Sequence, residues 1–237
     1  MKNHFFKAKY FSLILCTTII YHLQANAQDS PVMNYLQQAG DFADIYNGRI
    51  EPVYSSIIYE NLPYYMTSEF TAAAVVFKNK YYPNQRARLD LFREQLIILP
   101  PEKRHGIIVS SQNVERVFIY NKIFVFLNPP KKYGIKDGYY IQLLESEKIK
   151  LYCKESYTIR QKQLVSVFDN KTRYYLFYRD QCYTVKNKGS FSKLFPQYKK
   201  QINQYAKDHK LNFNQRPDES LIALAGYCEE LITSTNK

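Results

Sequence analysis

The sequence predicts a mainly β protein: an antiparallel meander sheet, curved into a partial barrel or a sandwich, with a two-helix appendage at its C-terminus. Three observations predict this fold. Short segments rich in Tyr, Phe, Val and Ile alternate with Asn, Asp, Gly and Pro between residues 69 and 186. Brief polar interruptions join several of these segments, as in hairpins. From about Ser190 the apolar residues recur at helical spacing instead.

Residues 1–27 have the pattern of a cleaved export signal. Lys2, Lys7 and Lys9 give a basic start, residues 11–21 form an uncharged, largely apolar run, and residues 25–27 are a small-x-small cleavage site. We therefore expect the mature chain to begin at Gln28. An uncleaved membrane anchor is the alternative, but the run is about half of the ~20 residues that span a bilayer.

Lipidation at Cys16 is disfavoured because Leu15, which precedes it, is not the small residue that such processing requires. No other stretch is long and apolar enough to cross a membrane. The sequence thus predicts an exported protein of the periplasm or outer envelope, with no transmembrane segment after signal cleavage.

The body of the chain predicts ten strands joined mainly as hairpins. Polar interruptions at Asn79 with Lys80, around Glu147, and at Arg179 with Asp180 suit the turns. The predicted strands are 69–78, 81–92, 95–99, 106–110, 114–120, 122–127, 138–145, 148–154, 174–178 and 181–186.

Residues 82–91 show the alternation of a half-buried strand. Arg86, Arg88 and Asp90 fall on one face, which we expect to be wet, and leucine and alanine fall on the other. Residues 117–126 are apolar at nearly every position. They predict central strands that are covered on both faces.

Two amphipathic helices are predicted after the strands. Tyr198, Ile202 and Tyr205 mark the apolar face of the first, and Asp218 is an N-cap for the second. The predicted organisation is a signal peptide at 1–27, an antiparallel β domain at 28–189, and a helical hairpin at 190–237 packed on the sheet as a lid. The alternative is a helical surface that lies on an anionic membrane or docks a partner.

The charge balance favours anionic partners. Removing residues 1–27 subtracts three lysines and no acidic residue, which leaves 30 basic against 21 acidic side chains and a formal charge of +9. This charge fits lipid headgroups, lipopolysaccharide or acidic glycans, and it also fits a merely solvated surface. Nucleic acid is not expected, because the lysines are spread along the chain and no nucleic-acid-binding motif is present.

The cysteines and histidines predict no metal site and no cofactor. Cys153 and Cys182 lie in predicted strands and are a possible disulfide, whereas Cys228 lies on the apolar face of a helix. The alternative is three buried thiols. The mature chain keeps only His105 and His209, and no cysteine pair has the close spacing of a zinc or redox site.

No catalytic residue is predicted. Asp90 and Glu94 are two nearby carboxylates, but residues four apart in a strand lie about 13 Å apart, too far for glycosidase chemistry. A charged strand face with cross-strand ion pairs is the preferred interpretation. A hydrolase without a recognisable motif stays as a remote alternative.

Clustered tyrosines and the basic helix supply a candidate partner or ligand surface. Tyrosine suits such interfaces, but it is also a strand former, so core packing is the competing interpretation. The candidate residues are Tyr64, Tyr65, Tyr139, Tyr140, Lys199 and Lys200.

Three sequence blocks resemble a group of exported proteins of Gram-negative bacteria rich in TonB-dependent uptake systems. The blocks are YNGR at 46–49 followed by Glu51 and Pro52, LDLFREQL at 89–96, and KLFP at 193–196. The resemblance implies a periplasmic or outer-envelope setting. It implies no activity, because the group has no known one.

The sequence thus favours a non-enzymatic accessory protein that binds another envelope protein or an anionic envelope surface. The alternative is a carrier that holds a lipid or other apolar ligand in a curved sheet, with the helices as a lid. Unfilled apolar side chains on the sheet would favour the carrier, and an exposed tyrosine patch would favour partner binding.

Overall fold

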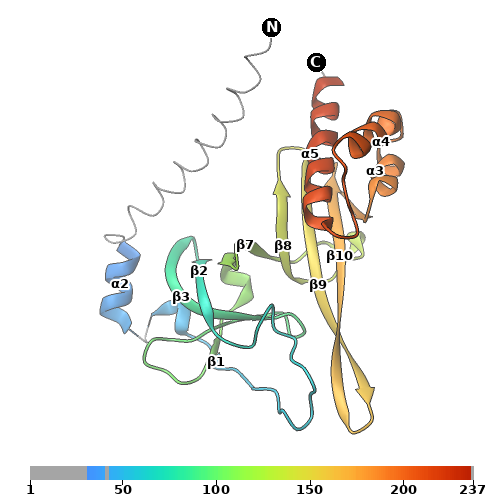
Figure 1. Ribbon diagram of the computed structural model, residues 1–237. Helices are drawn as coiled ribbons and strands as arrows, with labels where there is room; N and C mark the ends of the chain where they lie inside the picture. Colours follow the sequence, from blue (N-terminus) through green and yellow to red (C-terminus); the bar gives the residue numbers. More distant parts are fainter. Residues whose placement is uncertain (1–30, 41–42, 236–237) are drawn as a thin grey trace.

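The computed structural model describes residues 31–40 and 43–235. The predicted signal peptide at 1–27 lies outside the described residues. Figure 1 shows a curved sheet whose far end carries a group of C-terminal helices.

The described chain forms one antiparallel sheet of eleven strands in the order β1-β5-β4-β3-β2-β6-β7-β8-β9-β10-β11. The sheet is open, with β1 and β11 at its edges. The predicted antiparallel meander is therefore confirmed, and the sheet does not close on itself. The strands are β1 Arg49–Ile50, β2 Thr71–Phe77, β3 Lys80–Asp90, β4 Gln95–Ile98, β5 Ile107–Ile108, β6 Val114–Ile119, β7 Lys122–Leu127, β8 Gly138–Glu145, β9 Ile149–Lys162, β10 Val165–Tyr178 and β11 Gln181–Val185.

Three hairpins turn through two residues that both have positive φ. This geometry suits the right-handed twist of the paired strands and favours polar side chains such as Asn and Asp. The turns are Lys78 with Asn79, Tyr120 with Asn121, and Arg179 with Asp180. The first turn lies one residue earlier than the sequence predicted.

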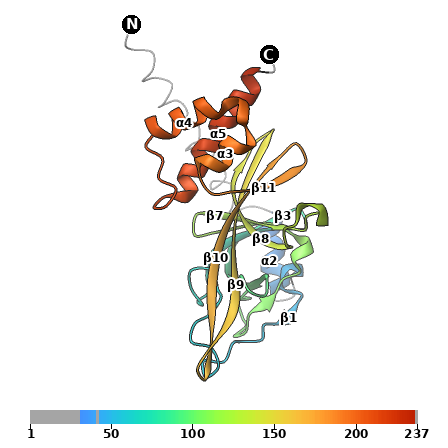
Figure 2. The same ribbon diagram turned by 90° about the vertical axis from the view of Figure 1, so that its right-hand side faces the viewer.

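The β9–β10 hairpin is much longer than predicted. Its two strands have 14 residues each, whereas the sequence predicted only 148–154 and 174–178. Residues 155–173 form the outer half of the hairpin, which extends beyond the rest of the sheet as an arm (Figure 2), and they are mostly polar. Few of these residues, such as Phe168 and Tyr157, are apolar and packed, so the two strands lack the regular apolar alternation on which the prediction depended.

Four helices are described: α2 Pro31–Ala39, α3 Lys188–Leu194, α4 Lys199–Asp208 and α5 Pro217–Thr235. The predicted two-helix hairpin is corrected to three helices, because a capping box at Asn187 and Ser190 already starts α3 before the predicted appendage. We call residues 188–235 the cap. None of the described helices has the length and apolar character of a membrane span. Single 3₁₀ turns lie at Asp44–Tyr46, Ser111–Asn113, Lys131–Tyr133 and Pro196–Tyr198.

Two large apolar cores hold the fold together. The first fills the face shared by β2–β8 and includes Leu89, Leu96 and Phe124. The second lies between the cap and β9–β11 and includes Phe191 and Leu224. The cap therefore covers its part of the sheet with packed side chains.

Polar contacts fasten the cap to the sheet. Asp218, at the start of α5, receives hydrogen bonds from Lys122 Nζ (2.8 Å) and Tyr174 Oη (2.9 Å). Glu229, farther along α5, accepts hydrogen bonds from Ser146 Oγ and from the backbone N–H of Lys148. These contacts and the second core hold the cap against the sheet.

Candidate functional site

The four tyrosines proposed as a contact surface are buried, which corrects that prediction. Tyr64, Tyr65, Tyr139 and Tyr140 expose at most 7% of their surface. The backbone N–H of Tyr65 bonds to the carbonyl of Leu89, which draws residues 64 and 65 against β3. The other two lie side by side on β8, where both faces of the sheet are covered.

The proposed disulfide is also corrected, because all three described cysteines are free. Cys153 on β9 pairs with Tyr174 of β10, and Cys182 on β11 pairs with Phe177 of β10. Strand β10 lies between the two cysteines. Their partners on β10 are three residues apart, and because side chains alternate along a strand, the two thiols point to opposite faces of the sheet. Burial raises the pKa of Cys153 to about 12 and that of Cys182 to about 11, so both thiols are protonated at neutral pH.

Asp90 and Glu94 do not share a strand face, contrary to the prediction. Asp90 ends β3, and Glu94 lies in the following turn with φ of +55°. Asp90 is fully buried, and Arg88 is largely covered. The prediction that this face of 86–90 is exposed to solvent is therefore wrong for both residues. The segment that leads from β1 to Tyr65 covers this face.

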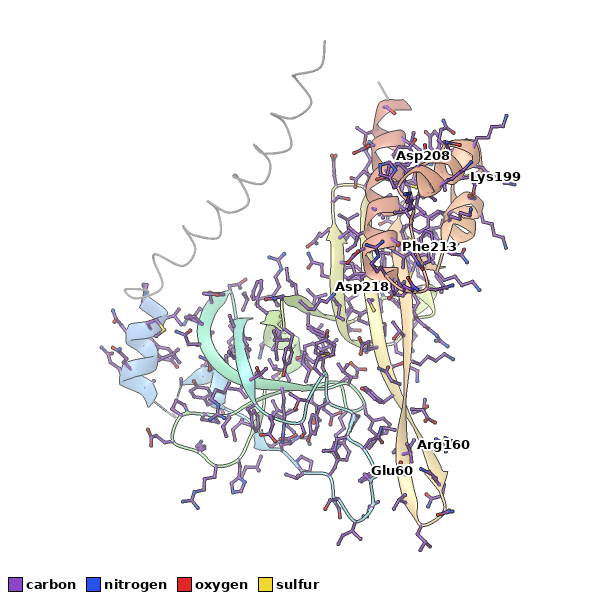
Figure 3. All side chains as sticks on the ribbon, in the orientation of Figure 1. Glu60, Arg160, Lys199, Asp208, Phe213 and Asp218 are labelled. Atoms are coloured by element: carbon purple, nitrogen blue, oxygen red, sulfur yellow. The ribbon has the colours of Figure 1, made fainter. Side chains whose placement is uncertain are left out.

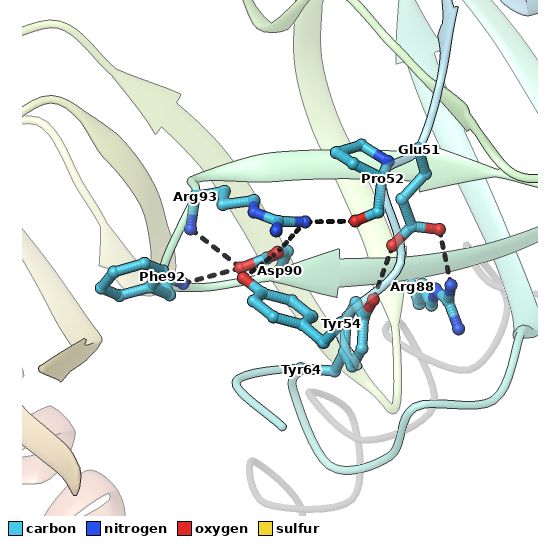
Figure 4. Close-up of polar contacts among 8 residues, drawn as sticks. All are labelled: Glu51, Pro52, Tyr54, Tyr64, Arg88, Asp90, Phe92 and Arg93. Carbon is cyan, nitrogen blue, oxygen red and sulfur yellow. Dashed lines mark hydrogen bonds and ion pairs between the residues drawn. The ribbon is translucent and has the colours of Figure 1, made fainter. Parts of the chain in front are cut away.

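Glu51 and Arg88 form the first of three buried carboxylate–cation pairs (Figure 4). Arg88 Nη2 donates to Glu51 Oε2 at 2.5 Å, and Tyr64 Oη donates to Oε1 at 2.7 Å. The Arg88 guanidinium also lies 4.4 Å from the centre of the Tyr64 ring. The Glu51 carboxylate is thus neutralised and hydrogen-bonded on both oxygens.

Asp90 and Arg93 form the second pair. Asp90 Oδ1 accepts hydrogen bonds from the backbone N–H groups of Phe92 and Arg93, and Tyr54 Oη donates to Oδ2 at 2.7 Å (Figure 4). Arg93 lies 3.9 Å from Oδ2 and stacks on the Tyr54 ring. Burial raises the pKa of Asp90, and this effect outweighs the hydrogen bonds and the Arg93 charge, which lower it. Burial also raises the pKa of Tyr54.

Glu94 and Lys154 form the third pair. Lys154 Nζ donates to Glu94 Oε1 at 2.6 Å and to the carbonyl of Tyr139 at 2.9 Å, while Glu94 Oε2 accepts the Tyr139 N–H. A Cβ at Gly138 would lie 2.3 Å from this carboxylate, so only glycine fits there. Burial raises the pKa of Glu94 and lowers that of Lys154.

We call these three pairs the buried charge cluster. Every carboxylate oxygen in it accepts a hydrogen bond, and its acidic and basic side chains balance. Glu51 and Asp90 expose at most 5% of their surface, so a substrate has no access to them. The cluster joins the segment after β1, the β3–β4 turn and β9.

The cap carries an open cleft of about 970 Å³ between α3, α4 and the segment that follows α4. Five lysines and no acidic residue line it, and we call it the lysine cleft. Its lysines are Lys188, Lys193, Lys199, Lys207 and Lys210. Figure 3 places Lys199 and Phe213, another lining residue, on the cap, far from Arg160 on the β9–β10 arm and from Glu60 in the segment beside it.

The charges of the lysine cleft are unpaired. None of the ion pairs formed among the described residues includes any of its five lysines. Ser192 also lines the cleft, and its buried Oγ has no hydrogen-bond partner within the described chain. Ala206, Leu211 and Phe213 add apolar surface. The cleft therefore offers cations, a hydroxyl and an apolar wall without internal partners.

The two predicted lysines lie in different surroundings. Lys199 lines the lysine cleft, whereas Lys200 lines a neighbouring groove with Tyr205, Asp208 and His209. The other four cleft lysines and Ser192 were not predicted as site residues from the sequence. A usable signal was present, because residues 181–207 contain six lysines and no Asp or Glu.

No protein-family model, no curated protein and no solved structure matches the chain. Among the described residues, no group of three or more His, Cys, Asp or Glu side chains is placed to hold a metal ion.

Proposed function

We propose that this chain is an exported, non-enzymatic accessory protein of the bacterial periplasm or outer envelope, and that it binds an anionic envelope component through the lysine cleft. One observation carries the proposal: five lysines surround one open cleft, and among the described residues no carboxylate lines it and none forms an ion pair with them. The export address comes from the pattern of residues 1–27.

The electrostatics of the cleft favour an external anion. Like charges around one depression repel one another and attract counter-ions, and walls of low dielectric strengthen that field. Several cations elsewhere in the described chain have carboxylate partners, as in the pairs of Arg160 with Asp169 and Lys162 with Glu60, whereas none of the five cleft lysines does. An anionic ligand would supply the partner that the fold does not give to the cleft lysines.

The two alternative functions receive less support. A carrier needs an unfilled apolar space, but buried side chains fill the sheet face beneath the cap and the face shared by β2–β8. A hydrolase needs accessible acids, but Glu51 and Asp90 are buried, and all three carboxylates of the buried charge cluster are paired.

A second binding function is favoured by the tip of the β9–β10 arm. Leu164 at its turn is 96% exposed, and Ile57, in a segment bonded to the arm through Ser166, is 85% exposed. Ile58 and Ile159 add further exposed aliphatic surface. Exposed apolar side chains at a protruding tip suit contact with another envelope protein. The tip and the lysine cleft lie at opposite ends of the molecule, so an accessory protein could bridge two partners (Figure 3).

The test of the proposed function compares two charge-matched variants of the chain from Gln28 onward. The cleft variant replaces its five lysines with glutamine. The control replaces five exposed lysines elsewhere, namely Lys103, Lys131, Lys132, Lys136 and Lys171. Affinities for heparin, polyglutamate and phosphatidylglycerol vesicles are measured at two salt concentrations.

We expect the cleft variant to bind its preferred polyanion at least about tenfold more weakly, since each lysine near an anionic surface contributes roughly 1 kcal/mol. The control should change about twofold or less. Equal losses in the two variants would show that net charge, and not the cleft, governs binding, and would overturn the proposal.

The export address has its own test. N-terminal sequencing of the protein recovered from the envelope fraction should start at Gln28. Recovery of a chain that begins at Met1 in the cytoplasm would contradict the periplasmic or outer-envelope location.

A further inference from the structure

We infer that the lysine cleft recognises a phosphate-bearing amphiphile, with its phosphate held by the lysines and Ser192 and its apolar part on the wall that includes Phe213. This inference rests on the proposed anion-binding function and names the chemical class of its ligand. Three features of the cleft support it in turn.

The cations of the cleft are all lysines. Guanidinium groups match planar carboxylates through paired hydrogen bonds, whereas an ammonium group acts as a compact point charge. Arg160 shows the first mode in this protein, because its Nε and Nη2 bond the two oxygens of Asp169 at 2.8 and 3.2 Å. No arginine lines the cleft. Several point charges that approach from α3, α4 and the segment after α4 suit a tetrahedral group with three free oxygens and nearly two negative charges.

Ser192 supplies a donor that the fold leaves unused. The residue is 8% exposed, and its Oγ is one of four buried side-chain polar atoms without a partner in the part of the chain that the structure describes. Buried hydroxyls are normally hydrogen-bonded, so an orphan in the lining of a cationic cleft indicates an external acceptor. A phosphate oxygen is an acceptor of the right charge.

The apolar wall and the size of the cleft indicate that the phosphate carries a larger group. Ala206, Leu211 and Phe213 would stay in contact with water if a bare phosphate bound, and a volume of about 970 Å³ suits a drug-sized ligand. The ligand is therefore a phosphate monoester with an apolar part. Its source is either a lipid headgroup in a bilayer or a free, water-soluble phosphate ester.

The experiment is isothermal titration of the chain from Gln28 onward with four soluble probes: dihexanoyl phosphatidic acid, dihexanoyl phosphatidylcholine, decanoate and inorganic phosphate. We expect phosphatidic acid to bind at least about tenfold more tightly than each of the others. The cleft variant should lose this binding, and the control variant should keep it. Ser192→Ala should weaken it about tenfold, the value of one hydrogen bond to a charged group, whereas Ser110→Ala, at an exposed serine, should not.

Sedimentation with vesicles that contain phosphatidic acid separates the two sources. Cleft-dependent binding to vesicles identifies a lipid headgroup, and binding of the soluble ester alone identifies a free phosphate ester. Both results support the shared chemistry.

Two results would overturn the inference, and only one of them would also overturn the proposed anion-binding function. Cleft-dependent binding of heparin or polyglutamate without preference for phosphatidic acid would overturn the phosphate assignment and leave the proposed function intact. Equal binding of every probe by wild type and cleft variant would overturn both.

Discussion

The buried charge cluster and the lysine cleft are both rich in charge, yet they differ in how the fold treats that charge. The cluster pairs Glu51, Asp90 and Glu94 with three cations and gives every carboxylate oxygen a hydrogen bond. The cleft gathers five lysines with no acidic residue in its lining. One region is closed and neutral, and the other is open and cationic.

This difference separates stability from binding. A buried charge whose partners are all internal has no capacity left for a ligand, and removing one partner leaves the other uncompensated. An exposed charge without a partner contributes little to folding and keeps its capacity. Changes in the cluster should therefore alter the free energy of unfolding, and changes in the cleft should alter affinity.

The largest effect is expected from Lys154→Met. Methionine keeps the apolar stem of the side chain but removes the ammonium group, which lies 2.6 Å from Glu94 Oε1, so the Glu94 carboxylate loses its cation. Breaking a buried pair in this way costs about 3–5 kcal/mol. Urea unfolding of wild type and variant measures the loss. A change below about 1 kcal/mol would contradict the structural role of the pair.

The pH dependence of Lys154→Met sharpens the same point. Burial raises the pKa of Glu94 above its ordinary value of 4.5, and loss of Lys154 removes the group that opposes this rise. A carboxyl whose folded pKa is raised stabilises the protein below its unfolded pKa and loses that contribution as pH rises through the folded value. The deficit of the variant should therefore shrink as the pH falls from 7 toward 4.5. A deficit that stays constant or grows on acidification would contradict this assignment.

A smaller effect is expected from Tyr54→Phe. The change removes the hydroxyl that donates to Asp90 Oδ2 at 2.7 Å and keeps the ring, so we expect a loss of about 1–3 kcal/mol. Tyr59→Phe is the matched control, because Tyr59 packs in the same aromatic group but its hydroxyl makes no hydrogen bond within the described residues. Thermal unfolding compares the two, and equal shifts would show that the bond to Asp90 contributes nothing.

The smallest effect on stability is expected from the cleft variant itself. Replacing its five lysines with glutamine removes repulsion and breaks no ion pair, so the free energy of unfolding should change by about 0.5 kcal/mol or less. Urea unfolding alongside the charge-matched control measures this change. A loss above about 2 kcal/mol would show that the lysines are part of the fold, and would remove the distinction between the two regions.

Much of the fold could be predicted from local pattern. Segments such as 114–127, with apolar strands around a short turn, carried enough signal for their strands to be placed within a residue or two. The β9–β10 arm could not be predicted from local pattern, because each of its strands depends on the other for pairing. It also depends on Asn61, 107 positions away, whose side chain hydrogen-bonds with the backbone N–H and carbonyl of Phe168. No local pattern contains that contact.

The candidate site was harder to predict than the fold. Tyrosine is a residue type that is common at contact surfaces, which is why Tyr64 and Tyr139 were predicted as candidate surface residues. Their burial depends on tertiary packing, which the local sequence does not show. Lys199 and Lys200 are neighbours in sequence, yet the turn of α4 directs them to different grooves. The absence of acidic residues from 181–207 was visible in the sequence. What it could not show was that five lysines meet around one cleft with Ser192.

The most direct measurement is a two-dimensional ¹⁵N NMR titration of the chain from Gln28 onward with dihexanoyl phosphatidic acid. We expect the largest chemical-shift changes at the amides of Ser192, Lys193, Asn203, Lys207 and Phe213, all of which line the cleft. Residues of the buried charge cluster should not shift. Changes spread over lysines outside the cap, or centred on Leu164 at the tip of the arm, would contradict the assignment of binding to the lysine cleft.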